Sequence, residues 1–221
     1  MFSMAWLEQI LRLVRINCFG GIGFVFSLFL ACGLISSRPI FAKSLSGDMD
    51  LYKLDPSHTQ ALFKVSHLGF SYTVGQFTEI QGELAIDEKT PTKSKVNVEI
   101  ATKSVSTHHS DRDEHLHKAD FFDAKKYPKI TFSSTKISKK SEKVYLVEGN
   151  LKIHGREKPV KFEFTRMRTG PDMQGKTRTG GFASFSIKRS DFGMNYMQGE
   201  DKIGDDVEIT LNLEAVIQPK D

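Results

Sequence analysis

From residue 51 onward, apolar and polar residues alternate along the chain with a period of two. This alternation is typical of β-strands that turn one face to a core and the other to solvent. The pattern is clearest near the end of the chain, where valine, isoleucine and leucine alternate with acidic and polar residues. It predicts eight strands, over residues 61–67, 80–86, 96–100, 130–134, 145–153, 160–164, 183–187 and 207–215.

The connections between these strands are short and contain turn-forming residues, for example at 87–89, 154–156 and 170–172. Such connections join antiparallel neighbours, because a parallel crossover needs a much longer segment. Eight antiparallel strands bury their edges by closing into a barrel, which either encloses one small ligand or is filled by side chains. We therefore predict an all-β fold, an eight-stranded antiparallel barrel over residues 51–221 that follows a short linker at 43–50.

Residues 110–122 lack the alternation, and we expect a short helix there between two of the strands. Ser110 is a favourable N-cap residue, and acidic residues fill the first turn, where the helix dipole favours negative charge. Asp111 and His115 stand four residues apart, so we expect them to pair on one face of the helix. Phe121 and Phe122 would end this helix and turn toward the barrel.

The helical stretch is also the most reactive part of the chain, because four of the seven histidines and several acids lie between residues 107 and 122. A zinc site needs three or four converging ligands, for which Asp111, His115 and His108 are candidates. The H-E-x-x-H motif is absent, and a capped helix with a salt-bridged, solvated face accounts for the same residues. A metal-dependent hydrolase stays an alternative hypothesis, and we assign no metal ligand and no catalytic residue.

Composition narrows the classes of function. Hydrophobic residues make up 39% of the chain and charged residues 26%, which is ordinary for one globular domain. The formal net charge is +4 without a long run of lysine and arginine, so nucleic-acid binding is not expected. The 17 phenylalanines favour strands and an apolar pocket. Since the G-x-S-x-G motif of serine hydrolases is also absent, we predict a protein that is not an enzyme.

The N-terminus has the features of an export signal. Two arginines precede the uncharged stretch 18–35, and Ala42 offers a cleavage site, so we predict a signal peptide over residues 1–42. Both cysteines, Cys18 and Cys32, would be removed with it. The predicted location is therefore the periplasm. Two alternatives stay open, an uncleaved membrane anchor and lipid attachment at Cys32.

Five motifs, in order along the chain, resemble those of the YceI-like family. The first is YKLDPSHTQALFKVSHLGFSYTVGQF, and the second is SDRDEHLHKADFFDAKKYPKITF with its paired phenylalanines and Tyr-Pro. The third is GNLKIHGREKPV, and the last two are SIKRSDFGM and DDVEITLNLEA. Together they cover essentially all of residues 51–218, and five motifs in one order make a specific match.

The resemblance implies a lipocalin-like, eight-stranded barrel that is usually exported. It also implies an amphiphile in the lumen, either a polyprenyl lipid or an isoprenoid quinone, held by a carrier without enzymatic activity and without a cofactor. Some members look to be associated with a membrane cytochrome b. A homodimer is a further expectation that the sequence leaves open.

A ligand of this kind needs an apolar tube with a cap, and alternation indicates which side chains face inward. A long tail binds because it leaves water, with about 0.8 kcal/mol for each buried methylene. We expect Phe121 and Phe122 to cap the tube from the helix. The tube residues that we predict are Phe63, Val65, Phe77, Phe132, Phe164 and Phe185.

A polar head group would need partners at the mouth of the tube. We predict Arg112, His115 and Arg189 for this role, and the alternative for them is pairing within the protein with Asp111, Asp113 or Asp191. A third hypothesis for the whole chain is a stress-response interaction module whose barrel is filled by its own side chains. A cavity in the barrel would separate this hypothesis from lipid binding.

Overall fold

The computed structural model describes residues 49–199 and 201–220. The predicted signal peptide at 1–42 and almost all of the linker at 43–50 lie outside the described residues. Within them, no helix is both long and apolar enough to cross a membrane.

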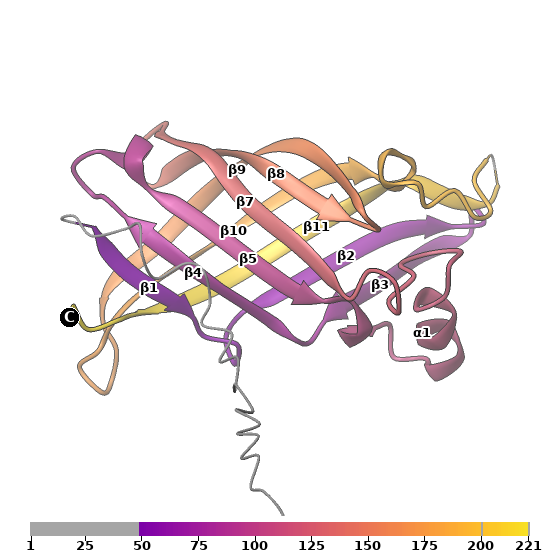
Figure 1. Ribbon diagram of the computed structural model, residues 1–221, viewed down its shortest axis with the longest axis horizontal. Helices are drawn as coiled ribbons and strands as arrows, with labels where there is room; N and C mark the ends of the chain where they lie inside the picture. Colours follow the sequence, from indigo (N-terminus) through magenta and orange to yellow (C-terminus); the bar gives the residue numbers. More distant parts are fainter. Residues whose placement is uncertain (1–48, 200, 221) are drawn as a thin grey trace, which may run out of the picture. The chain divides into compact units, whose positions relative to one another are not determined.

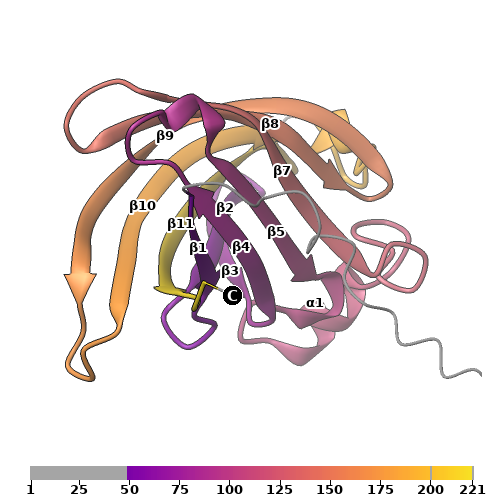
Figure 2. The same cartoon turned by 60° about the vertical axis from the view of Figure 1, so that its left-hand side comes forward.

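Antiparallel strands form one continuous sheet, in the order β1-β4-β5-β7-β8-β9-β10-β11-β2-β3-β6, and pairing of β1 with β11 closes it into a barrel. In Figure 2 the strands curve around a common interior. Their bounds are β1 (Asp50–Leu54), β2 (Gln60–His67), β3 (Ser71–Phe77), β4 (Ile80–Ile86), β5 (Lys95–Ala101), β6 (Val105–Ser106), β7 (Lys129–Lys139), β8 (Val144–Ile153), β9 (Arg156–Pro171), β10 (Thr177–Lys188) and β11 (Ile203–Ile217).

The prediction of an eight-stranded antiparallel barrel is confirmed, although the sheet contains more strands than eight. Three of the eight positions around the barrel hold two successive short strands each. β1 and β2 share the first of these positions, and both pair with β11. β4 and β3 share the second, where β4 pairs with β1 and β3 pairs with β2. β5 and β6 share the third, where β5 pairs with β4 and β6 pairs with β3. Five single, longer strands, β7 to β11, complete the circle.

Three register shifts bend the longer strands. They lie at Ser134/Lys136 in β7, at Gly180/Gly181 in β10 and between Ile203 and Val207 in β11. At Gly181 a Cβ atom would lie 2.1 Å from the carbonyl oxygen of Thr165, so only glycine fits. Such irregularities increase the local twist and let a sheet close on itself.

Side chains in the barrel fall into two classes of burial. Two clusters are fully buried, one around Tyr52, Leu54 and Ala215 and the other around Ile153 and Phe192. Other inward-facing side chains, such as Phe63, Phe77 and Val98, are only half-buried. The interior of the barrel is therefore packed unevenly.

The helix is shorter than predicted. α1 spans Ser110–Leu116, and its N-cap is His109, whose Nδ1 accepts a hydrogen bond from the backbone N–H of Arg112 at 3.4 Å. Ser110 is therefore the first helical residue, because the cap position lies one residue earlier. α1 lies beside β3 at one end of the barrel (Figure 1). Three short 3-10 helices complete the described elements: η2 (Pro91–Lys93), η3 (Thr102–Ser104) and η4 (Arg189–Phe192).

Candidate functional site

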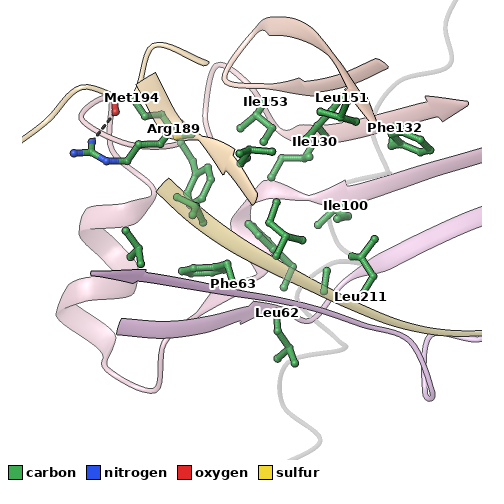
Figure 3. Close-up of a pocket in the computed structure, with 18 of the residues that line it drawn as sticks. Leu62, Phe63, Ile100, Ile130, Phe132, Leu151, Ile153, Arg189, Met194 and Leu211 are labelled. Atoms are coloured by element: carbon green, nitrogen blue, oxygen red, sulfur yellow. Dashed lines mark hydrogen bonds between the residues drawn. The ribbon is translucent and has the colours of Figure 1, made fainter. Parts of the chain in front are cut away.

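A cavity of about 180 Å³ lies inside the barrel at the end that carries α1. The side chains that line it are apolar, with the single exception of Arg189. In the close-up, Ile130, Leu151 and Ile153 come from one wall, and Phe63 and Leu211 face them from the other (Figure 3). The cavity can hold a hydrocarbon group, and its walls offer almost nothing to a polar one.

The tube residues predicted from the sequence lie on the inner surface of the barrel. Seven of the eight apolar residues predicted for tube and cap line this cavity, and Phe164 lines a second cavity of about 120 Å³ farther along the barrel. Contact with a ligand stays a prediction for all of them. Other lining residues were missed, although strand alternation marks most of them equally well: Val98, Ile100, Val160, Phe162, Ile187, Val207, Ile209 and Leu211.

Two of the phenylalanine rings pack closely against glycines on a neighbouring strand. A Cβ atom on Gly75 would come within 2.3 Å of Cζ of Phe63, and one on Gly149 within 2.5 Å of Cζ of Phe132. The missing side chains leave room for the rings at the wall. The centre of the lumen therefore stays open despite the bulky lining.

An aromatic cap closes the α1 end of the cavity. The ring of Phe122 meets Phe77 edge-on at 5.5 Å, and the rings of Phe121, His115 and Tyr196 pack against one another at 5.0 to 5.3 Å. The two phenylalanines follow α1 instead of ending it, in a turn where the N–H of Phe122 donates to the carbonyl of Leu116. The predicted cap residues are thus at the mouth, but a turn carries them instead of a helix.

Arg112 is occupied within the protein. Its Nε donates to Oγ1 of Thr107 at 2.7 Å and its Nη2 to the carbonyl of Thr107 at 2.9 Å. Thr107 in turn donates its backbone N–H to the carboxylate of Asp113 at 2.8 Å. This network fastens α1 to β6. The expected alternative, a direct pair of Arg112 with Asp111 or Asp113, is replaced by bonds through Thr107.

Arg189 lines the cavity at the α1 end, but it is buried and its guanidinium is used within the protein. Arg189 is 4% exposed and donates to three carbonyls, those of Gly204 at 2.8 Å, Met194 at 2.6 Å and Ile203 at 2.9 Å. Figure 3 shows the bond to Met194. Burial lowers the pKa of its guanidinium, and the carboxylate of Asp205 acts in the opposite direction. Arg189 therefore joins η4 to the start of β11 and does not pair with Asp191.

The histidines of the helical stretch point to different partners. Nε2 of His115 bonds to Asp120 at 3.0 Å, which replaces the predicted pair with Asp111, and Nε2 of His117 donates to the carbonyl of Lys103 at 3.0 Å. His109 caps the helix. Of the three candidate ligands, His115 bonds to Asp120 and Asp111 accepts a hydrogen bond from Ser110 at 3.3 Å. Among the described residues these candidates form no group of three converging ligand atoms, so the arrangement favours the structural interpretation of the cluster.

Potential metal ligands converge elsewhere among the described residues. The ligand atoms of Asp55, His58 and Glu214 lie within 4.8 Å of one another, a grouping that the sequence did not indicate. Nη1 of Arg178 donates to both carboxylates, at 2.5 Å to Asp55 and 3.0 Å to Glu214. Arg178 holds the pKa of Asp55 well below its usual range. The guanidinium of Arg178 therefore already pairs with both carboxylates of this group, which identifies it as an ion-pair cluster.

The chain is similar to several known proteins. A sequence model of the YceI-like domain matches residues 52–215. A UPF0312 protein of Pectobacterium atrosepticum is 39% identical over 169 residues, which cover 76% of this chain and 86% of the relative. The crystal structure of the Campylobacter jejuni YCEI protein superposes with a TM-score of 0.64 at 30% identity, over 70% of this chain and 90% of that one.

A more distant neighbour shares the fold alone. It is a polyisoprenoid binding domain from Saccharophagus degradans, implicated in plant cell wall breakdown, with a TM-score of 0.58 at 15% identity over 76% of this chain and 98% of that one. The match of the family model along most of the barrel, together with relatives near 40% identity, decides the family. This chain belongs to the family of YceI-like domains.

Proposed function

We propose that the protein binds an isoprenoid-type amphiphile, either a polyprenyl lipid or an isoprenoid quinone, with the tail in the barrel lumen. The observation that carries this proposal is the apolar cavity beneath an aromatic cap, lined by side chains from strands all around the barrel. The protein is a carrier or store of this lipid and performs no catalysis on it.

The driving force is removal of the tail from water. About ten buried methylenes offer about 8 kcal/mol before the costs of association, which is enough for micromolar or tighter binding. A narrow tube suits a single chain, because one chain can contact the wall on every side. The half-buried lining residues also gain van der Waals contacts with the tail, which they lack when the lumen is empty.

The head group has a natural place at the cap. His115 is half-buried there, between the rings of Phe121 and Tyr196, with its Nε2 on Asp120. We place the head group beside His115. Arg112 and Arg189, which were predicted for the same role, support it indirectly by holding α1 and the loop before β11 in place.

Relatives support the lipid class. The polyisoprenoid binding domain of Saccharophagus degradans has the same fold, so this barrel type is suited to an isoprenoid chain. The periplasm is part of the proposal because of the predicted signal peptide at 1–42. We also propose a membrane cytochrome b as a partner, which co-purification from membranes tests. We further propose a homodimer, which sedimentation of the purified protein tests.

The two alternative hypotheses fit the geometry less well. An interaction module with a filled barrel needs side chains in the space where cavities of about 180 and 120 Å³ are found. A metal-dependent hydrolase built on the helical stretch needs converging ligands, and His115 and His117 have separate partners.

Uptake of a polyprenol or an isoprenoid quinone by the purified protein tests the proposal. Phe63→Asp places a carboxylate on the lumen wall and should weaken uptake at least 100-fold, since an unpaired charge in an apolar site is costly. Phe70→Asp is the matched control, because Phe70 is 90% exposed on the turn after the same strand. Equal uptake by both variants, each with a native circular dichroism spectrum, would contradict a ligand in the lumen.

A further inference from the structure

The lumen is divided into two chambers. The outer chamber is the cavity of about 180 Å³ beneath the aromatic cap, and the inner chamber is the cavity of about 120 Å³ beyond it. Four residues line both, one from each of β5, β7, β9 and β11, and we call them the waist: Val98, Phe132, Phe162 and Leu211.

The phenylalanine rings of the waist lie between the two chambers and are held in place by their neighbours. Phe162 stacks on Phe185 with ring centroids 4.6 Å apart and an interplanar angle of 10°, and it meets Phe132 at 5.7 Å. The ring of Phe132 lies against Gly149, where a Cβ atom would be 2.5 Å from it. A tail that passes the waist has to shift the Phe162 ring from this stack, so passage has a cost that the outer chamber does not impose.

The inner chamber ends at a charged floor. Its walls are mainly apolar, but Arg166 and Glu88 lie at its far side, paired through Nη1 of the arginine at 2.5 Å. Burial alone would lower the pKa of Arg166, but the contacts with Glu88, Tyr145 and Tyr52 act in the opposite direction, and together they raise it. The guanidinium also lies over the ring of Tyr145 at 5.1 Å. A hydrocarbon end gains nothing by displacing this pair.

We propose that the waist and the floor make the lumen a two-step gauge of tail length for single-chain isoprenoid lipids. This inference rests on the proposed function. Short tails end in the outer chamber, tails of intermediate length stop at the waist, and long tails fill the inner chamber up to the pair of Arg166 and Glu88. Affinity therefore rises with tail length for tails that end in the outer chamber and levels off for tails that end at the waist. It rises again for tails that enter the inner chamber, until the tail reaches the floor.

A series of linear polyprenols with increasing numbers of isoprene units tests the gauge. For the native protein we expect affinity to climb by about fourfold for each methylene buried in the outer chamber, then to level off, then to climb again. Phe162→Ala opens the waist, so it should remove the plateau and tighten the binding of intermediate tails about tenfold. Val98→Phe narrows the waist, so long tails should bind this variant no better than short ones.

Phe182→Ala is the matched control, because Phe182 is 43% exposed, on the outer face of β10, and lines neither chamber. It should reproduce the native profile. An even climb with tail length in the native protein, unchanged by Phe162→Ala and Val98→Phe, would overturn the gauge while leaving lipid binding intact. If no polyprenol binds to the native protein at all, the proposed function fails and the gauge with it.

Discussion

The barrel lumen and the helical stretch at residues 107–122 use their side chains in opposite ways. The helical stretch holds four histidines and several acids, and the structure directs them to neighbours close in the chain, such as Asp113 to Thr107. The lumen holds almost only apolar side chains from strands far apart in the chain, and they surround a common space. The helical stretch, with its many titratable side chains, has a structural role, and the apolar lumen forms the candidate site.

The difference teaches that a high density of reactive groups in a sequence does not predict a reactive site. Short polar side chains readily bond to the nearby backbone, so a cluster in sequence tends to be consumed locally. Convergence needs residues from separate elements. Here it occurs at the lumen wall and, for charged groups, around Arg178 at the other end of β11 from the cavity mouth.

The largest effect that this comparison predicts is on the lumen wall. Phe185→Asp should reduce lipid uptake at least 100-fold, because the carboxylate replaces a ring stacked on Phe162 in an apolar site. Phe182→Asp, on the outer face of the same strand, should change uptake less than about twofold. Binding titrations with an isoprenoid quinone measure both, and equal effects of the two variants would show that the lumen is not the site.

An effect of similar size, on stability instead of lipid uptake, is expected at Arg189, which connects the two regions at the mouth. Arg189→Met leaves three buried carbonyls without their donor, and we expect the free energy of unfolding to fall by about 3 kcal/mol. Urea unfolding measures this loss. Lys188→Met is the control, since the Lys188 side chain is 55% exposed, and it should cost less than about 1 kcal/mol. An equal loss in both variants would refute the bracing role of Arg189.

The ion-pair cluster makes stability depend on pH. Because Arg178 holds the pKa of Asp55 below its ordinary value of 3.8, this contribution is complete above that pH and disappears as the pH falls through the lowered pKa. Asp55→Asn should therefore lower the free energy of unfolding at pH 7 by about 1.5 kcal/mol, and by progressively less below about pH 4. Unfolding curves between pH 2 and 7 check this, and a difference that stays constant with pH would contradict it.

The smallest effect is expected at His115, in the region that first suggests a metal site. His115→Ala removes one ring of the cap and a half-exposed bond to Asp120, so stability should fall by less than about 1 kcal/mol. Lipid affinity should fall less than about tenfold. Calorimetric titration with micromolar zinc should show no binding to the native helical stretch, and a zinc-dependent hydrolysis lost in this variant would revive the hydrolase hypothesis.

Much of the fold followed from alternation, and the exceptions have physical reasons. β3 was missed because tyrosine and valine occupy its outer face, at Tyr72 and Val74, where alternation predicts polar residues. β6 is only two residues long, too short for any period to be visible. The N-cap of the helix was predicted one residue late, at Ser110, because His109, which is not a favoured cap residue, accepts the capping bond.

The candidate site was predictable to a similar degree. Alternation placed Phe63, Phe132 and Phe185 on the inner face, because strand geometry alone decides which way a side chain points. It could not predict that Arg189 would be buried, since that depends on three carbonyls brought together by tertiary structure. Nor could it divide the lumen, because the waist arises from ring positions across four strands.

Identification of the lipid that co-purifies with the undenatured protein tests the central claim most directly. Mass spectrometry of the extracted lipid should show one class of single-chain isoprenoid amphiphile, in near-equal amount to the protein. Phe63→Asp protein, purified in parallel, should yield little of it, because its lumen wall carries a charge. Repeated recovery of lipid-free native protein that also takes up neither polyprenol nor quinone would contradict the account.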